Sequence, residues 1–245
     1  MAEDVVYGVN AVSEVLRAGP ARVNRIFVAR ESRAHGIQTL LDAARESRVR
    51  FDYVPQAKIN ELTGSKTHQG VAATVSPVGY FTLEEGLADL PATATILVLD
   101  NVQHPSNVGL LIRSALGADA GALIMANRGG APVSNAVVQA SAGAVFHLPI
   151  IRVTNVGQAL RDLKEAGFWV YGLTGESGED LFACEWPERA ALVLGNETTG
   201  LRPGVRKACD ACLRIPLAAG LESLNAAVAG SIALFQVAQN RRRKE

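Results

Sequence analysis

An asparagine and an arginine follow a strongly apolar run at a spacing that could serve chemistry. The run 96–100 ends in an aspartate, and Asn107 and Arg113 come after it. The pattern predicts a helix over 106–116, with Asn107 at its amino-terminal cap and Ser106 as a competing cap. Arg113 would leave this apolar helix and present a guanidinium to a phosphate or a carboxylate. The alternative is an arginine that reaches from a core helix to the solvent.

A second polar loop lies between two glycines, directly after the apolar run 191–194. Gly195 and Gly200 would let a ligand approach the backbone closely, and Glu197 would place a carboxylate at the end of the strand. The alternative is an ordinary strand-to-helix turn that is capped by a threonine of the loop.

The third polar loop precedes a long apolar helix, which the pattern predicts from Leu224 to about residue 240. Ser223 is a plausible cap for this helix. Asn225 would then face inward at the helix start, where free backbone N–H groups collect. The alternative is a capped helix with a solvated asparagine.

Strand-like and helical stretches alternate from residue 95 onward, which is typical of an α/β fold with a mostly parallel sheet and helices on both faces. Strands are expected at 96–100, 122–126, 145–150, 168–171, 191–195 and 213–216, and helices at 106–116, 135–142, 156–166 and 224–240. Ligands of such sheets bind beyond the carboxyl ends of the strands, so the three loops predict a single site. Its expected members are Asn107, Arg113, Glu197 and Asn225.

The first 75 residues have a separate pattern of short elements. Strands are expected at 25–29, 51–54 and 70–75, and helices at 9–16 and about 37–44. A Ser-Pro-Val-Gly break follows, and the region up to Pro91 has the composition of a linker. The sequence thus predicts a small α/β domain over 1–75, a linker over 76–92 and a larger domain over 93–245.

The composition is that of a packed globular protein. Of the 245 residues, 48% are apolar and 20% are charged, with 24 basic and 24 acidic side chains. This balance excludes a disordered chain, a collagen and a disulfide scaffold, and it argues against nucleic-acid binding through bulk charge. No apolar run approaches the roughly 18 residues of a membrane span, and the acidic amino end lacks the pattern of a secretory signal. Three cysteines suit a reducing compartment, so we expect a cytoplasmic protein.

Familiar cofactor and metal motifs are missing from the sequence. It has no G-x-G-x-x-G opening a helix and no complete phosphate-binding loop, which argues against the usual dinucleotide and triphosphate sites. A lone C-x-x-C at 209–212 lacks the second pair that a structural zinc needs. We therefore expect no metal, and the two cysteines are expected to be structural, although a redox pair stays open.

At the three loops the sequence resembles the SpoU family, also called TrmH, of RNA ribose 2′-O-methyltransferases, which have the SPOUT fold. Asn107-x-Gly109-x-x-x-Arg113 is similar to the first family motif, Leu194-Gly195-Asn196-Glu197-x-x-Gly200-Leu201 to the second, and Ile215-Pro216-Leu217 with Ser223-Leu224-Asn225 to the third. In the amino-terminal part, Tyr7-Gly8-Val9-Asn10-Ala11-Val12 and His68-Gln69-Gly70 resemble a small RNA-binding domain similar to ribosomal proteins of the L30 type. The likeness is strongest to members that methylate a guanosine of 23S ribosomal RNA.

The resemblance implies a cofactor and an assembly. The cosubstrate would be S-adenosylmethionine, used without a metal, and a trefoil knot near the carboxyl end would hold it. Contacts to this cofactor would come from the second and third loops, at Gly195, Asn196, Ile215, Leu217, Ser223 and Leu224. The enzyme would be a homodimer with the final helix at the interface.

For catalysis, the resemblance assigns the activation of the ribose hydroxyl to Arg113. Because a guanidinium stays protonated in proteins, we expect Arg113 to grip the adjacent phosphate and stabilise the developing alkoxide rather than act as a base. Glu197 and Asn225 would position Arg113 or the nucleotide, and Asn107 would brace the first loop beside the substrate. The small domain would bind structured RNA, with 23S ribosomal RNA as the expected partner. Its candidate phosphate contacts are Arg22, Arg25, Arg30, Arg33 and Lys66.

Three other functions fit parts of the sequence. A tRNA ribose methyltransferase of the same family is the nearest of them, although the extra amino-terminal domain favours ribosomal RNA. A non-catalytic RNA-binding or ribosome-assembly factor would not need the asparagine, arginine and glutamate side chains of the three loops together. A small-molecule enzyme is disfavoured because the phosphate-binding fingerprints are missing.

Overall fold

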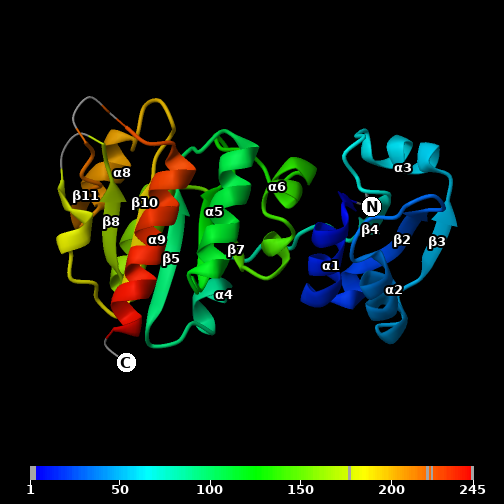
Figure 1. Cartoon of the computed structure of the whole chain (residues 1–245). Coiled ribbons are helices and arrows are strands. Elements are labelled where there is room, and N and C mark those ends of the chain that lie inside the picture. The colour runs from blue at the N-terminus through cyan, green and yellow to red at the C-terminus, as the bar shows by residue number, and fades with distance from the viewer. Residues whose placement is uncertain (1–3, 176–177, 219–220, 222, 244–245) are drawn as a thin grey trace. The chain divides into compact units, whose positions relative to one another are not determined.

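The computed structural model describes residues 4–175, 178–218, 221 and 223–243, which fall into two compact units (Figure 1). The first unit contains the chain up to Gly79 together with Val133–His147. The second contains Tyr80–Pro132 and the chain from Leu148 onward.

The first unit is built on a four-stranded sheet with the order β1-β4-β2-β3. β1 and β2 run antiparallel to β4, and β3 runs parallel to β2. The strands are β1 (Asp4–Tyr7), β2 (Val23–Ala29), β3 (Phe51–Val54) and β4 (Val71–Val75), and the helices are α1 (Val9–Ala18), α2 (Ile37–Glu46), α3 (Gln56–Thr63) and α6 (Asn135–Ala140), with 3-10 turns η1 (Pro20–Arg22) and η2 (Ala144–Phe146). The structure confirms the predicted elements of the first 75 residues and adds β1 and α3, which the sequence pattern did not predict.

A turn of three residues, His68-Gln69-Gly70, joins the start of β4 to α1. The side-chain oxygen Oε1 of Gln69 accepts a hydrogen bond from the N–H of Val9 at 2.9 Å and so satisfies the first turn of α1. His68 is buried, and its Nδ1 accepts a hydrogen bond from the N–H of Gly70 at 2.9 Å, while its Nε2 lies 2.7 Å from Oδ1 of Asn60. These hydrogen bonds hold the turn against α1 and α3 of the small unit.

A later segment of chain, Val133–His147, packs on α1 of the first unit. Gly143 makes a close approach there, because a Cβ at this position would lie 2.8 Å from Cβ of Glu14. Nε2 of His147 lies 3.2 Å from Oε1 of the same glutamate. The segment that carries α6 and η2 therefore belongs to the core of the first unit although the larger unit surrounds it in sequence.

The second unit contains a seven-stranded sheet with the order β7-β6-β5-β10-β8-β11-β9. Every pairing among its described strands is parallel, which confirms the predicted parallel sheet. The strands are β5 (Ala94–Leu99), β6 (Ala122–Ala126), β7 (Ile150–Val153), β8 (Trp169–Leu173), β9 (Glu179–Asp180), β10 (Arg189–Leu194) and β11 (Ala211–Arg214), and the helices are α4 (Leu83–Ala88), α5 (Pro105–Gly117), α7 (Val156–Glu165), α8 (Pro203–Ala208) and α9 (Ala226–Arg242), with the 3-10 turn η3 (Leu181–Ala183).

Helices cover both faces of this sheet, as the sequence predicts (Figure 1). On one face, Ile96 of β5 packs with Leu160 of α7 in an apolar core that also contains α8. On the other face, α5 and α9 lie side by side. Gly230 of α9 permits their close contact, because a Cβ there would lie 2.4 Å from the side chain of Leu111 and 2.5 Å from that of Leu194. Among the described helices, none has the length and apolar character needed to cross a membrane.

Two predicted strands differ from the structure, and the helices α4 and α8 and the short strand β9 are new. The strand predicted at 145–150 is wrong, since η2 occupies its first part and β7 starts only at its last residue. The strand predicted at 213–216 is shifted, because β11 begins and ends two residues earlier. Within 76–92, which has the composition of a linker, α4 forms behind a reciprocal capping box of Thr82 and Glu85.

Arg241 fixes the end of α9 to the starts of two strands. Its Nη1 donates to Oγ1 of Thr95 at 2.5 Å, and its Nη2 donates to the carbonyl oxygens of Ala94 at 2.9 Å and Glu188 at 2.8 Å. Ala94 and Thr95 begin β5, and Glu188 directly precedes β10. The chain has four consecutive basic residues at 241–244, and the first of them is therefore anchored to the protein.

Arg241→Gln is expected to lower the free energy of unfolding by about 1.5–3 kcal/mol, the range for losing hydrogen bonds from a charged donor. Urea unfolding curves would measure this change. Arg242→Gln is the matched control, because Arg242 is the next residue and is exposed. An equal loss in the two variants would contradict the anchoring role.

Candidate active site

Glu197 joins the loops that the sequence predicts to form one site. Its Oε1 accepts hydrogen bonds from Nδ2 of Asn107 at 2.9 Å and from the N–H of His104 at 3.1 Å. Its Oε2 accepts from the N–H of Gln103 at 3.2 Å. Oδ1 of Asn107 in turn accepts from Nδ2 of Asn225 at 3.1 Å. A chain of hydrogen bonds thus connects Asn107, Glu197 and Asn225, although 118 residues separate the two asparagines.

The carboxylate of Glu197 is held in its ionised form. Partial burial raises its pKa, but the hydrogen bonds from Asn107 and from the amides of His104 and Gln103 outweigh this effect and bring the pKa below its usual range. Glu197 is therefore a fixed negative charge at neutral pH, and it acts on its neighbours as an acceptor.

The two asparagines reach this chain from different helix positions than the sequence predicts. Asn107 is not the cap of α5, because His104 occupies the cap position and Pro105 starts the helix. Asn107 lies inside the first turn and is buried, with its amide turned to Glu197. The cap of α9 is Asn225, not Ser223, and its Oδ1 accepts from the N–H of Ala227 at 2.8 Å.

The glycine-bracketed loop is closed by its own backbone. Asn196 and Gly200 exchange two backbone hydrogen bonds, of 3.0 and 2.9 Å. A Cβ at Gly195 would lie 2.2 Å from the backbone of Gly200, so only glycine fits there. The side chain of Asn196 is used inside the structure, since its Nδ2 donates to the carbonyl oxygen of Asn101 at 3.1 Å. This bond ties the second loop to the first.

An ion pair between a buried aspartate and an exposed arginine joins these loops and was not predicted from the sequence. Asp100 is fully buried at the end of β5, and Arg202 donates to it from Nε at 2.7 Å, from Nη2 at 2.5 Å and from its N–H at 3.0 Å. The pair fixes the second loop to the strand that leads into the first. The sequence does show an aspartate at the end of an otherwise apolar strand, which indicates a buried carboxylate. No local pattern identifies its arginine partner.

Comparison with known proteins gives two matches that together span most of the chain. Residues 94–235 match the SpoU rRNA Methylase family, and residues 5–81 match the domain described as RNA 2'-O ribose methyltransferase substrate binding. The chain belongs to the SpoU family. The predicted membership in a family of RNA ribose 2′-O-methyltransferases is thereby confirmed, and RNA is the substrate that the amino-terminal match indicates.

Individual relatives extend over nearly the whole chain. The 23S rRNA (guanosine-2'-O-)-methyltransferase RlmB of Xanthomonas axonopodis pv. citri is 34% identical over 96% of this chain and 96% of its own length. An uncharacterized tRNA/rRNA methyltransferase of Synechocystis is 35% identical over 97% of this chain, which spans 63% of that relative. The structure of the SpoU methyltransferase AviRb from Streptomyces viridochromogenes, in complex with the cofactor AdoMet, has a TM-score of 0.80 at 26% identity and covers 98% of this chain and 91% of that one.

Arg113, the predicted catalytic arginine of this SpoU chain, stands apart from the hydrogen-bonded chain around Glu197. It is exposed on α5, six residues after Asn107. Within the part of the chain that the structure describes, it forms no hydrogen bond and no ion pair. Its guanidinium is therefore available to a ligand rather than bound by the protein.

The residues predicted to contact the cofactor lie directly after β10, after β11 and before α9. Ile215, Leu217 and Leu224 are half-buried, and Ser223 is exposed. Within the described ranges, the backbone groups of Gly195, Ile215 and Leu224 make no hydrogen bonds to protein. Their contact with a cofactor stays a prediction.

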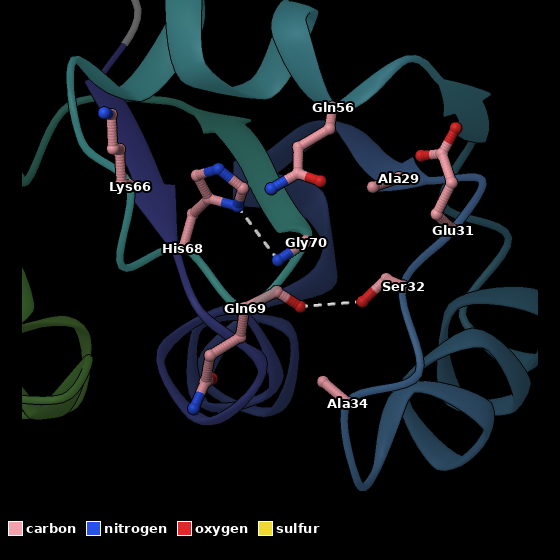
Figure 2. A pocket seen from close by; sticks show the side chains of 9 residues that line it. All are labelled: Ala29, Glu31, Ser32, Ala34, Gln56, Lys66, His68, Gln69 and Gly70. Carbon is pink, nitrogen blue, oxygen red and sulfur yellow. Dashed lines mark hydrogen bonds between the residues drawn. The ribbon is translucent and has the colours of Figure 1, made fainter.

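The substrate-binding unit has a pocket of about 290 Å³ beside the turn at His68 (Figure 2). Figure 2 shows the side chains of Glu31, Gln56 and Lys66 around it, and Oγ of Ser32 donates to the carbonyl oxygen of Gln69 at 2.8 Å. Lys66 is the predicted phosphate contact that lines this pocket, and the four predicted arginines of the unit do not line it. Arg25 pairs with Asp52 at 3.0 Å, Nη1 of Arg22 reaches the carbonyl oxygen of Pro77 at 3.5 Å, and Arg30 and Arg33 are exposed.

No cluster of three or more potential metal ligands occurs among the described residues. The C-x-x-C pair consists of free cysteines. Burial raises the pKa of Cys209 to about 12, so this sulfur is a protonated thiol at neutral pH. That environment is unlike the activated thiolate that redox exchange needs.

Proposed function

We propose that this protein transfers the methyl group of S-adenosylmethionine to a ribose 2′-hydroxyl of structured RNA, at a guanosine of 23S ribosomal RNA. The observation that carries the proposal is the Asn107–Glu197–Asn225 chain, because it draws the three family motifs into one site. The RlmB relative, 34% identical over 96% of the chain, supports the ribosomal substrate. A ribosomal substrate would place the enzyme in the cytoplasm.

The open backbone groups of the second and third loops fit an adenosine-containing cofactor. The backbone N–H and C=O groups of Gly195, Ile215 and Leu224 have no partner among the described residues, and such groups can bind a purine edge. Asn196, Leu217 and Ser223 would complete the contacts. When bound, the cofactor supplies a methyl group already activated as a sulfonium, so no metal is required. The family's trefoil knot, which would involve these loops, stays a prediction.

Arg113 would act on the ribose itself. A guanidinium can bind the adjacent phosphate through two N–H groups and stabilise the oxygen of the 2′-hydroxyl as negative charge develops on it. Glu197 would hold the segment 103–107, which leads into α5, in one conformation, and Asn107 and Asn225 would fix the distance between the starts of α5 and α9. Such alignment of the reacting groups can supply several kcal/mol of the barrier, up to about 7–11 in well-oriented systems.

The first unit would hold the RNA around the target. Lys66 is the predicted basic side chain that lines a pocket, and Gln56 and Glu31 beside it carry donors and acceptors suited to nucleotides. Arg22, Arg25 and Arg30 would contribute phosphate contacts on the surface of the same unit. Sequence-specific recognition of RNA commonly uses unpaired loops, in which the ribose is accessible.

The proposed activity is tested with unmodified RNA and labelled S-adenosylmethionine. Transcripts of 23S ribosomal RNA and of tRNA are incubated separately, and the methylated position is mapped as an alkali-resistant linkage. Label in the 23S transcript at a guanosine ribose is expected. Label in tRNA alone would show that the substrate is tRNA, the alternative that the name of the Synechocystis relative leaves open. Label in neither RNA would contradict the proposed methyltransferase activity.

The proposed homodimer would form through exposed apolar side chains of α5 and α9. Leu110, Val228 and Phe235 are 47%, 48% and 48% exposed, which is high for such residues on two helices that pack together. Leu110 is one turn from Arg113, so the catalytic arginine would border this surface.

Phe235→Glu is expected to convert the dimer to a monomer, because it would bury a charge without a partner. Size-exclusion chromatography with light scattering measures the mass. Trp169→Glu, at a side chain that is 50% exposed on β8, is the control and should leave the mass unchanged. A monomeric wild-type protein, or a dimer that survives Phe235→Glu, would count against this interface.

A further inference from the structure

The second unit has a groove of about 420 Å³ at the carboxyl ends of its strands. Arg113 does not line this groove. Its lining comes from the loops after β6, β7 and β10 and from the starts of α7 and α8. The charged and polar members of the lining are Arg128, Arg161, Arg202, Thr154 and Asn155. We name it the arginine groove.

The arginine groove carries positive charge that the protein does not neutralise. None of its lining residues, all within the described ranges, has a carboxylate. Asp100 balances Arg202, but Arg161 donates only to the neutral Oε1 of Gln158. Arg128 is exposed and forms no hydrogen bond or ion pair with any described residue. Two guanidinium groups of the groove thus have no carboxylate partner among the described residues and can meet an anion.

The start of α7 adds donors to the same groove. Asn155 caps this ten-residue helix by accepting from the N–H of Gln158 at 3.1 Å. The N–H groups of Val156 and Gly157 begin the helix and have no intrahelical acceptor, and the helix dipole makes this end positive. A ligand with several anionic oxygens suits such a lining better than an apolar ligand or a cation does.

Both sides of the arginine groove are fixed to the candidate active site. On one side, Arg202 is bound to Asp100 at the end of β5. On the other side, the loop that carries Arg128 packs on the first motif loop, since the N–H of Ala131 donates to the carbonyl oxygen of Val102 at 2.9 Å. A Cβ at Gly130 would lie 3.1 Å from the same oxygen. A ligand in the groove would therefore be held at a fixed position relative to Asn107 and Glu197.

We propose that the arginine groove binds backbone phosphates of the substrate RNA strand close to the ribose that is methylated, an inference that rests on the proposed function. Arginines bind phosphate oxygens through pairs of N–H groups, and such contacts set the position of a strand without reading its sequence. Arg128 and Arg161 would supply the charge, and the start of α7 would supply backbone donors. The groove thereby fixes the register of the RNA across the catalytic unit.

The test compares two double variants that remove equal charge. R128Q/R161Q removes the free arginines of the groove, and R242Q/R243Q removes two exposed arginines that follow the anchored end of α9 at the opposite edge of the sheet. Affinity for a 23S ribosomal RNA transcript is measured by fluorescence anisotropy over a range of salt concentrations. Each lost phosphate contact on a single strand lowers the slope of log affinity against log salt by about 0.7, so R128Q/R161Q should be shallower by about 1.4. Its KM for RNA should rise about tenfold with little change in kcat.

The outcomes separate this inference from the proposed function. Binding is read without methyl transfer, so a wild-type protein that binds RNA but transfers no methyl group contradicts the proposed activity and still tests the groove. A wild-type protein that methylates RNA, together with an R128Q/R161Q variant whose affinity and slope equal those of R242Q/R243Q, overturns the groove alone. The groove variant should fold normally, since Arg128 forms no hydrogen bond or ion pair with the described residues and the hydrogen bonds of Arg161 go to Gln158 of its own helix. Thermal unfolding of both variants checks this.

Discussion

Arg113→Ala is expected to reduce methyl transfer by about 10²–10³-fold, because the loss of one preorganised donor to a developing oxyanion has an effect of that size. The side chain is exposed, has no protein partner within the described residues, and lies on the helix that also carries Asn107. Its removal therefore leaves the hydrogen bonds around Glu197 in place. Binding of S-adenosylmethionine, measured by calorimetry, should be within about twofold of wild type.

Two further variants separate the geometry of Arg113 from its charge. Arg113→Lys keeps the charge but loses the planar pair of donors, so we expect only partial recovery of the rate. Arg242→Ala removes an exposed arginine at the far end of α9 and should leave the rate unchanged. Near-normal turnover of Arg113→Ala on a good RNA substrate would show that this residue does not act on the ribose.

The position of the site could be predicted because parallel strands end at a common edge. Asn107, Glu197 and Asn225 lie far apart in the sequence, yet each follows or adjoins a predicted strand end, and the structure brings all three together. The apolar runs at β5 and β10 carry this prediction, since a buried strand with polar residues directly after it has few other interpretations.

The details of the site could not be predicted, because local signals are degenerate. Several polar residues precede α5 and α9, and each could cap its helix. The tertiary contacts decide which residue takes the cap position. Asn107 donates to Glu197 from within the first turn of α5, and His104 is the cap. Likewise, Asp100 finds Arg202 across 102 residues, a pairing that depends on the order of strands in the sheet.

The sequence pattern also does not predict which of the two sheets a helix packs against. The pattern at 135–142 predicts a helix correctly, but nothing in its spacing indicates that α6 packs on the first unit. Close contacts such as that of Gly143 with Glu14 decide this, and they join residues more than a hundred positions apart. Periodicity predicts which face of an element is buried, and it carries no information about which core buries that face.

Glu197→Gln is expected to reduce methyl transfer at least a hundredfold without removing any group that touches the reacting atoms. Donors from Asn107 and from the amides of Gln103 and His104 converge on the carboxylate within 3.2 Å, and Nδ2 of Asn196 reaches it at 3.5 Å. An amide in its place would turn an N–H group toward one of these donors, so at least one hydrogen bond to a charged acceptor is lost, at a cost of about 1.5–3 kcal/mol. The segment 103–107, which leads into α5, would then lose its fixed position relative to Asn225.

A matched carboxylate distinguishes this positioning role from simple destabilisation. Glu85 also accepts from a backbone N–H and a side chain, both of Thr82, and its pKa is likewise lowered, first by the backbone hydrogen bond of Thr82. Glu85→Gln should lose stability while keeping kcat, whereas Glu197→Gln should lose kcat.

Because the pKa of Glu197 is lowered in the folded protein, its stabilisation is present above the ordinary glutamate pKa of about 4.3 and is lost as the pH falls below it. The stability difference between wild type and Glu197→Gln should therefore shrink in urea titrations at acidic pH, and a difference that does not change with pH would show that the charge of Glu197 does not hold the loops together.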